Sequence, residues 1–379
     1  MTTADNTDGR PFDVIVWGAT GFTGKLVAEY LAQSYPPGET LRWAVAGRNR
    51  NKLDDLVRSL DLDGPGPDII VADSHDPDGM LQMAAQTRVV LTTVGPSAKY
   101  GSALVAACVA KGTHYCDLCG EAQWIRKMID QHHDDAQKSG AKIVMCCGFD
   151  SIPSDMGVFS LQQAALERHD QYCEQMTLLV RAMRGGASGG TFASMLNAID
   201  EARSDRAIAR VLGDPYGLNP EGERSGPDGS DQRGARFDDI AQVWTAPFIM
   251  ASINTRVVRR SHALSDYRYG EDFRYGESTI SGKGFGGRIK ATLMSIGLGL
   301  FVVLAAMPFT RKHLVQRFLP KPGEGPSARE RENGFFKLIL VGRLPDGTQM
   351  RQEITGDRDA GYGSTSKMLA ESAVCLALD

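Results

Sequence analysis

Three glycines at intervals of three residues stand where a short apolar run changes into a helical pattern. The stretch from residue 14 to residue 31 is VIVWGATGFTGKLVAEYL. In such a turn the first glycine permits a tight bend, the second lets the backbone approach a pyrophosphate, and the third lets the helix pack closely on the strand. Free N–H groups and the positive end of the helix dipole then hold the anion. The residues expected to bind a dinucleotide here are Gly18, Thr20, Gly21, Phe22, Thr23 and Gly24.

The end of the second apolar run indicates which dinucleotide binds. Strands that bind NAD end here in Asp or Glu, which accept hydrogen bonds from the ribose hydroxyls. This chain has Arg48 and Asn49 at that place and no carboxylate. A guanidinium binds a 2′-phosphate with two hydrogen bonds, so NADP(H) is the expected cofactor, although Arg48 could also be a solvated loop charge. Asp73, which follows the third run, is expected beside the adenine.

The loop after the fourth apolar run is expected to pass beside the nicotinamide, because ligands lie across the carboxyl ends of parallel strands. Thr93, Gly95 and Pro96 belong to this loop and suit a rigid support under a flat ring, with a plain turn as the alternative. Hydride transfer to a double bond would also need a proton donor from the neighbouring loops. The candidates are Lys99, Tyr100, Tyr115 and Asp150.

Cysteine spacing argues against a metal site. Cys116 and Cys119 form one short pair, but no second pair has the spacing of zinc ligands, so no metal is expected. The chain has seven cysteines in all, and this odd number favours a reducing compartment such as the cytoplasm over a disulfide framework. The formal net charge of −4 gives no general attraction to nucleic acid, and no nucleic-acid partner is expected.

The elements that must position these residues follow an alternating order. Short apolar runs alternate with helical patterns up to about residue 150, which predicts an α/β fold with a Rossmann-type, doubly wound parallel sheet over residues 11–153. Residues 1–10 are polar and are expected to form a disordered tail. The expected strands are 14–17, 43–46, 68–71, 89–93, 114–116 and 142–146.

The alternation stops after Asp150, and residues 154–363 are expected to form an α+β substrate domain. A helix over 154–167, a strand over 176–183 and a hairpin of strands 335–341 and 349–355 are expected within it. Residues 213–240 are rich in Gly, Pro and charge and predict a mobile surface loop. A closing helix is expected over 364–379.

An uncharged apolar segment spans residues 291–309. As a helix it would measure roughly 28 Å, barely the thickness of the hydrocarbon layer. Spanning would separate the last strands from the rest of their domain, so a peripheral contact through 288–317 on the inner membrane face is the favoured interpretation. A buried core helix, a homodimer face and a binding surface for an acyl chain are the alternatives. The flanking cations are Arg288, Lys290, Arg311, Lys312 and Arg317.

Seven motifs in order along nearly the whole chain resemble the saccharopine dehydrogenase-like oxidoreductases, and within them the trans-acting enoyl reductases. They are GATGFTG (18–24), AGR (46–48), VGPSAKYG (94–101), GTHYCDLCGE (112–121), CGFDSIPSD (147–155), LPKPGEGPS (319–327) and TSKMLAESA (365–373). The resemblance implies an NADP-binding domain followed by an α+β substrate domain, and a link to lipid, polyketide and glycolipid synthesis. It does not supply a catalytic residue.

Two departures bear on function. Saccharopine-forming enzymes look like GLDPGIDH after the sixth strand, whereas this chain has GFDSIPSD and no histidine there, which puts an amino-acid substrate in doubt. The family also commonly has a small hydroxyl residue where Cys119 stands. We therefore expect an NADPH-dependent enoyl reductase acting on a hydrophobic, lipid- or polyketide-linked substrate. A saccharopine-type amine or imine dehydrogenase and a non-catalytic NADP-binding, lipid-associated protein are the alternatives.

Overall fold

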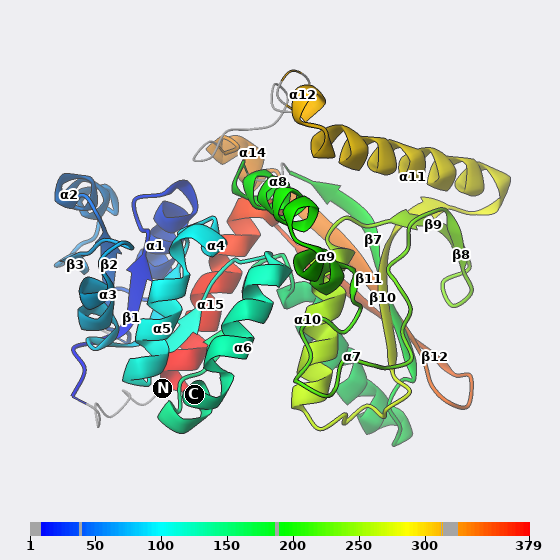
Figure 1. Ribbon diagram of the computed structural model, residues 1–379, viewed down its shortest axis with the longest axis horizontal. Coiled ribbons are helices and arrows are strands. Elements are labelled where there is room, and N and C mark those ends of the chain that lie inside the picture. The colour runs from blue at the N-terminus through cyan, green and yellow to red at the C-terminus, as the bar shows by residue number, and fades with distance from the viewer. Residues whose placement is uncertain (1–8, 38–39, 186–188, 312, 314–324) are drawn as a thin grey trace.

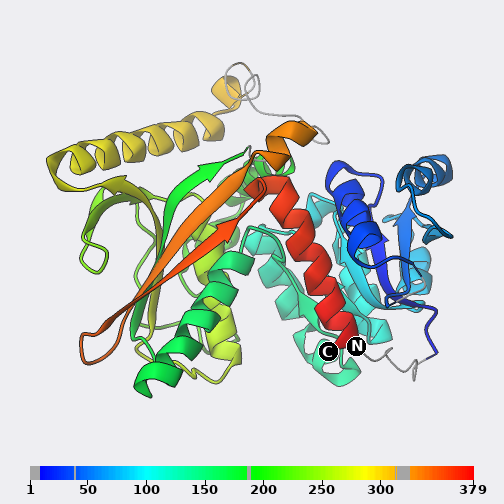
Figure 2. The ribbon, with the colours of Figure 1, turned by 180° about the vertical axis from the view of Figure 1, so that it is seen from behind.

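The structure is a computed structural model that describes residues 9–37, 40–185, 189–311, 313 and 325–379. Two sheets lie side by side, each with helices against it (Figures 1 and 2). Residues 1–8 of the expected tail lie outside the described residues. Arg10 is held in place, because its guanidinium donates to the carbonyl of Thr87 at 2.6 Å and to the hydroxyl of Thr113 at 2.8 Å.

The first sheet has six parallel strands in the order β3-β2-β1-β4-β5-β6. The order reverses between β1 and β4, which is the point where doubly wound sheets bind their ligands. The Rossmann-type fold predicted from the sequence is confirmed. The strands are β1 (Phe12–Trp17), β2 (Trp43–Gly47), β3 (Asp68–Val71), β4 (Thr87–Thr92), β5 (His114–Cys116) and β6 (Ile143–Val144).

Helices cover both faces of this sheet, since its strand residues are apolar on both sides. Ile15 and Val90 pack toward α3, α5 and α6, whereas Val14 and Val89 pack toward α1. The helices are α1 (Phe22–Ser34), α2 (Arg50–Ser59), α3 (Pro77–Ala84), α4 (Ser97–Tyr100), α5 (Ser102–Lys111) and α6 (Ala122–Ser139).

The last helix of the chain, α15 (Thr365–Leu378), belongs to the first sheet rather than to the second. Leu369 and Ala373 are fully buried in the same apolar cluster as Val14 and Val27. Tyr30 of α1 also donates a hydrogen bond to Glu371 of α15. Figure 2 shows this helix lying along the cofactor-binding unit, so residues distant in sequence complete that unit.

The second sheet is mixed, with the order β12-β11-β7-β10-β9-β8. Its central strand β7 pairs in parallel with β10 and antiparallel with β11, and the predicted hairpin of β11 and β12 is present. Helices α7 and α10 pack on one face through Leu161 and Val258. The strands are β7 (Gln175–Arg184), β8 (Arg236–Asp238), β9 (Val243–Pro247), β10 (Arg274–Gly282), β11 (Phe335–Arg343) and β12 (Gln349–Gly356).

The remaining elements connect or flank the two sheets. Most of them, including α9 and α10, were not predicted from the sequence. They are α7 (Ile152–His169), α8 (Gly189–Ser204), α9 (Arg206–Gly213), α10 (Ala251–Leu264), α11 (Gly284–Ala306), α12 (Pro308–Thr310), α14 (Ala328–Glu332) and the π-helix η2 (Ala360–Ser364).

The Gly- and Pro-rich segment 213–240 is irregular apart from β8, and it is anchored to α10. Asp228 accepts a hydrogen bond from Arg259 at 2.7 Å, and Asp231 accepts one from Arg256. Tyr216 is buried, and its hydroxyl accepts from the backbone N–H of Asp228 at 2.9 Å. These contacts were not predicted, and mobility of the segment stays a prediction.

The apolar segment forms most of α11, a single long helix across one end of the second sheet (Figure 1). Gly287, Ala291 and Ala305 are its buried residues, while Leu293 and Ile296 are 65% and 62% exposed. The interpretation as a core helix is therefore wrong. By length and composition alone, α11 could cross a membrane.

Candidate functional site

The turn between β1 and α1 has room for glycine alone at two of its three glycine positions. Gly18 has φ +83°, and a Cβ there would lie 2.6 Å from Cγ2 of Val94. A Cβ on Gly24 would lie 2.2 Å from the carbonyl oxygen of Gly18. The strand, the turn and the helix are thus packed as closely as the motif predicts, which brings the first turn of α1 to the carboxyl end of the sheet.

The first turn of α1 offers backbone N–H groups to an anion. Gly21 precedes the helix and is exposed, no side chain caps the helix, and no acidic residue lies in its first turn. Thr20 and Thr23 are partly exposed beside it. Phe22 is placed differently, because its ring packs edge-on against the ring of Tyr362 at 4.7 Å between centroids. An open helix N-terminus of this kind favours a phosphate.

Arg48 and Asn49 lie at the carboxyl end of β2, where the adenosine ribose is expected. Arg48 is exposed, while the side-chain oxygen of Asn49 accepts from the backbone N–H of Lys52 at 3.1 Å and caps α2. Asp73 follows β3, and its carboxylate accepts from the backbone N–H of His75 at 2.9 Å. Hydrogen bonds from His75, and after them the charge of Arg48, lower the pKa of Asp73. Arg48 therefore stands near an ionised carboxylate and still faces solvent.

The loop after β4 lies directly against the glycine turn. The hydroxyl of Thr93 donates to the carbonyl of Gly18 at 3.2 Å, and Gly95 and Pro96 are joined by a cis peptide bond. Gly95 is exposed, and a Cβ added to it would meet nothing within 4 Å. Open space thus adjoins this loop, as expected for a ligand that lies across the strand ends.

Glu121 holds this loop in position, a structural role that is common for a carboxylate at the start of a helix. Its carboxylate accepts from the backbone N–H of Ser97 at 2.8 Å, from the N–H of Ala98 at 3.3 Å and from the hydroxyl of Ser194 at 3.0 Å. Glu121 follows β5, Ser97 begins α4 and Ser194 belongs to α8.

Asp150 is the predicted proton donor with the most suitable surroundings. It follows β6, just before α7, and retains partial exposure. Burial, and after it the negative charge of Asp117, raises the pKa of Asp150 to about 7. Burial likewise raises the pKa of Asp117 to about 6, although Asp117 accepts hydrogen bonds from the hydroxyl of Tyr115 at 2.7 Å and from the backbone N–H of Cys119 at 2.9 Å. A carboxyl group that titrates near neutral pH suits proton transfer.

The other three candidates for proton donation are less well placed. Tyr115 is fully buried in the core of the first sheet and donates its hydroxyl proton to Asp117, so its selection as a donor is corrected. Burial raises the pKa of Tyr115 well above its usual value. Tyr100 turns its ring edge-on to His75 at 5.8 Å, on the side of the sheet where β3 ends. Lys99 is exposed on α4. Tyr115 is thus connected to Asp150 only through Asp117, whose charge acts on Asp150, and Tyr100 lies beside His75.

The residues at this edge fit an NADP(H) molecule. The glycine turn leaves backbone N–H groups for the pyrophosphate, the loop Thr93–Pro96 adjoins open space, and a guanidinium rather than a carboxylate follows β2. All these groups lie at the carboxyl ends of neighbouring strands, so one extended dinucleotide could contact them together.

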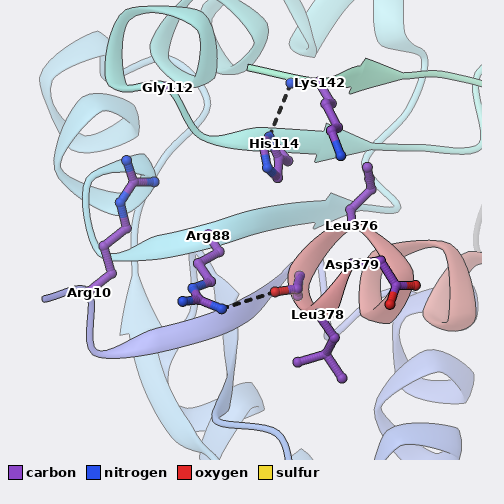
Figure 3. Close-up of a pocket in the computed structure, with 9 residues that line it drawn as sticks. Arg10, Arg88, Gly112, His114, Lys142, Leu376, Leu378 and Asp379 are labelled. Carbon is purple, nitrogen blue, oxygen red and sulfur yellow. Dashed lines mark hydrogen bonds between the residues drawn. The ribbon is translucent and has the colours of Figure 1, made fainter. Parts of the chain in front are cut away.

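Two cavities lie elsewhere and do not belong to this edge. Figure 3 shows one of about 340 Å³, lined by Arg10, Arg88, His114 and Lys142 around the C-terminal residue Asp379. These side chains lie at the amino ends of the strands, and Arg88 donates to the carbonyl of Ala377 at 3.1 Å. The first cavity thus surrounds the end of the chain rather than the cofactor.

The second cavity, of about 500 Å³, lies between segment 213–240 and β10 of the second sheet. Asp228 and Asp231 line it and are paired with Arg259 and Arg256. These two carboxylates of the cavity wall are therefore already paired.

Comparison with known proteins agrees with the geometry. Residues 14–144 match the model of the saccharopine dehydrogenase NADP-binding domain. A Mycobacterium tuberculosis protein named, provisionally, a trans-acting enoyl reductase is 42% identical over 382 residues, which cover 98% of this chain and 90% of that protein. The trans-acting enoyl reductase of Mycobacterium leprae is 37% identical over 381 residues, with the same two coverages.

One solved structure that aligns with most of this chain shares little sequence with it. The apo saccharopine dehydrogenase (L-Glu forming) of Saccharomyces cerevisiae is 11% identical, covers 96% of this chain and 91% of its own, and has a TM-score of 0.48. The predicted NADP(H) cofactor is confirmed by the match of the first sheet to an NADP-binding domain. The chain belongs to the trans-acting enoyl reductases and is an NADP-dependent oxidoreductase with the cofactor domain of the saccharopine dehydrogenases.

Proposed function

We propose that the protein reduces the carbon–carbon double bond of an α,β-unsaturated acyl group that is carried by a lipid or by another enzyme, and that Asp150 supplies the proton. The observation that supports this proposal most directly is the position of Asp150. This residue lies at the same strand-end edge as the glycine turn, and its pKa is raised to about 7. Bound NADPH supplies a hydride to the β-carbon of such a substrate. One proton must then reach the α-carbon, so that each turnover consumes one NADPH and one proton.

Each group of this chain has a separate task in the proposed reaction. The N–H groups at the start of α1 and the guanidinium of Arg48 bind the phosphates and fix the orientation of the dinucleotide. The loop Thr93–Pro96 supports the nicotinamide end. Because burial raises its pKa to about 7, Asp150 carries a proton below that pH and can donate it to the substrate.

We also propose that α11 rests on a membrane, in contact with the lipid that carries or dissolves the substrate. Its exposed apolar residues are Phe285, Ile289, Leu293, Ile296, Leu300, Val302 and Val303. A monomeric soluble protein rarely exposes so long an apolar row without a partner. Burying each such side chain in the acyl region would contribute about 1.5–3 kcal/mol.

A single membrane crossing by α11 conflicts with the pairing of the strands on either side of it. The strand before it, β10, and the strand after it, β11, both pair with β7. A crossing would leave these two strands on opposite sides of the bilayer, so a helix that lies along the surface is the arrangement we propose. The interpretation agrees with the path of α11 across one end of the molecule (Figure 2).

The charge pattern supports an anionic lipid surface as the proposed partner of α11. No Asp or Glu occurs between Glu277 and Glu324. Cations flanking an apolar helix bind the headgroups of anionic lipids, at about 1 kcal/mol for each one near the surface. Because NADPH and reduced cysteines belong to the cytoplasm, the inner face of the membrane is the proposed location. The cations of the acid-free segment are Lys283, Arg288, Lys290, Arg311, Lys312, Arg317 and Lys321, of which Lys312, Arg317 and Lys321 lie outside the described residues. Arg311 is paired with Asp200 at 2.6 Å, so Lys283, Arg288 and Lys290 are the described cations on which this proposal rests.

The function is tested by following NADPH oxidation with trans-2-enoyl thioesters of increasing chain length, with and without anionic vesicles. We expect turnover to increase with chain length and with vesicles, and the Asp150→Asn variant to bind NADPH without turnover. Oxidation of amino acids with NADP would instead support the amine dehydrogenase alternative. Tight NADPH binding without reduction of any enoyl thioester would support the non-catalytic alternative. Sedimentation velocity shows in the same preparations whether the protein is a homodimer.

A further inference from the structure

Residues from the C-terminal part of the chain surround Phe22, the first residue of α1. The guanidinium carbon of Arg331 lies over its ring, 5.5 Å from the centroid, and the ring of Tyr362 contacts it edge-on at 4.7 Å. A Cβ on Gly325 would approach the Phe22 ring to 2.5 Å, so the backbone there is packed against it. The ring of Phe22, beside the cofactor turn, is therefore covered by residues that follow it by some three hundred positions.

The covering segment 325–332 has a fixed conformation. Ser327 and Glu330 form a reciprocal capping box at the start of α14, and the carbonyl of Arg331 accepts from the backbone N–H of Asp359 at 2.9 Å. Asp359 in turn accepts from the backbone N–H groups of Tyr362 and Gly363 at 2.9 and 2.8 Å. The segment and η2 thus hold one another above the turn.

The guanidinium of Arg331 is held over Phe22 but has donors to spare. Its Nη1 donates to the carbonyl of Pro326 at 2.9 Å, and this is the one side-chain hydrogen bond it forms with the residues that the structure describes. A guanidinium has five N–H donors, and one oriented on an aromatic face presents the others at little further entropic cost. Arg331 is partly exposed, so a ligand can reach it.

We propose that Arg331 binds the pyrophosphate of NADP(H) and that segment 325–332 covers this part of the cofactor. The inference rests on the cofactor assignment. The pyrophosphate is the relevant group because Phe22 begins the helix whose N-terminus receives it, whereas Arg48, at the end of β2, is the candidate for the 2′-phosphate. A second-domain cation would thus complete a turn that otherwise binds through backbone N–H groups.

The test compares Arg331→Gln with Arg329→Gln, which removes an exposed arginine from the same short helix. Dissociation constants are measured by calorimetry for NADPH, NADH and 2′-AMP, which lacks the pyrophosphate. Arg331→Gln should weaken the binding of NADPH and of NADH by the same factor, about tenfold for the loss of a charge-assisted bond. The binding of 2′-AMP should not change. Arg329→Gln should bind all three as the unmodified protein does. Arg331→Lys keeps the charge, so its dissociation constants for NADPH and NADH should lie between those of Arg331→Gln and the unmodified protein.

Two results would overturn the inference. NADPH binding by Arg331→Gln equal to that of the unmodified protein would show that the guanidinium does not contact the cofactor. A loss of 2′-AMP binding equal to the loss of NADPH binding would show that the substitution disturbs the whole site rather than a contact with the pyrophosphate. A failure of the enoyl reductase proposal is distinguishable, because it would leave all these binding constants intact. An unmodified protein that binds neither coenzyme would contradict the cofactor assignment and this inference together.

Discussion

The carboxylate of Glu121 accepts a hydrogen bond from the backbone N–H of Ser97 at 2.8 Å, so a residue that follows β5 determines where the helix after β4 begins. The same carboxylate accepts from Ser194 of α8 at 3.0 Å. The loop expected under the nicotinamide is thereby joined to a helix of the second half of the chain. A shift of α8 would therefore act on the cofactor loop through the side chain of Glu121.

Replacing Glu121 with Ala should lower the stability of the cofactor domain. Glu121 is 2% exposed, and its removal leaves the buried N–H of Ser97 without an acceptor. Such an unpaired group costs about 1–3 kcal/mol. Urea unfolding followed by fluorescence should show an earlier midpoint, whereas Glu29→Ala, at an exposed position of α1, should not. An unchanged midpoint for Glu121→Ala would mean that water replaces the carboxylate at Ser97.

Turnover should depend on the protonation of Asp150. Because burial raises its pKa to about 7, the carboxyl carries a proton below that pH and loses it above. The rate of NADPH oxidation with an enoyl thioester should therefore fall as the pH rises through about 7. Asp150→Asn should abolish most turnover while the dissociation constant of NADPH stays within about twofold. A pH profile that is the same in both proteins would exclude Asp150 as the donor.

The first sheet could be predicted from the sequence because its information is local. Each strand and the helix that follows it are neighbours in the chain, and the glycine turn joins two such elements within seven residues. The order of the strands then follows from the rules of doubly wound sheets. Arg48 was found in the same way, since the second strand of such a sheet has a known place beside the ribose.

The second sheet could not be read in this way because its stabilising contacts are distant in sequence. Strand β10 buries Glu277 and Ser278, so it lacks the alternating apolar pattern of a half-buried strand. Helix α10 buries Arg256 and Arg259, which look like surface residues until Asp231 and Asp228 are seen to pair with them. Burial of charge is favourable only with such partners.

Arg331, which was not selected from the sequence, has the same property. Its contact is with Phe22, some three hundred residues earlier in the chain. Tyr115 was selected as a proton donor because it lies near the end of β5 in sequence. Its side chain is buried in the core. Period-2 alternation alone could not show this, because helices cover both faces of the sheet.

Glu277 should make the stability of the protein fall with rising pH. Burial raises its pKa from 4.5 to about 7, despite hydrogen bonds from the hydroxyl of Tyr275 at 2.7 Å and from Asn254 at 2.9 Å. Between these two pH values the folded protein keeps a proton that the unfolded chain has lost, so this group lowers the free energy of unfolding as the pH rises.

Because other groups titrate in the same range, the measured quantity is the difference between Glu277→Gln and the unmodified protein in urea midpoints from pH 4.5 to 7.5. The variant should gain relative stability toward pH 7.5. Glu353→Gln, at an exposed position of β12, serves as the control and should show no such trend. A constant difference for Glu277→Gln would mean that this carboxyl titrates normally in the folded protein.

Arg48→Ala should weaken the binding of NADPH about 10- to 100-fold. This corresponds to about 1.5–3 kcal/mol for hydrogen bonds to a charged group. NADH lacks the 2′-phosphate, so its dissociation constant should change by no more than about twofold. Arg50→Ala is the matched control, because Arg50 is exposed on α2 and pairs with Asp54 at 3.1 Å. Equal losses of NADPH and NADH binding in Arg48→Ala would contradict the role assigned to this guanidinium.

Replacing Leu293 and Leu300 together with Glu should release the protein from membranes. Both residues are more than half exposed on α11, and each contributes about 1.5–3 kcal/mol when its side chain enters the acyl region. The added charges would also be repelled by anionic headgroups. Co-sedimentation with vesicles that contain phosphatidylglycerol should fall to the background level, whereas Leu264→Glu, a change at an equally exposed leucine at the end of α10, should sediment as the unmodified protein does. If the unmodified protein never sediments with vesicles, and the double variant instead changes from dimer to monomer in sedimentation velocity, then α11 binds a second copy of the chain and the membrane proposal is wrong.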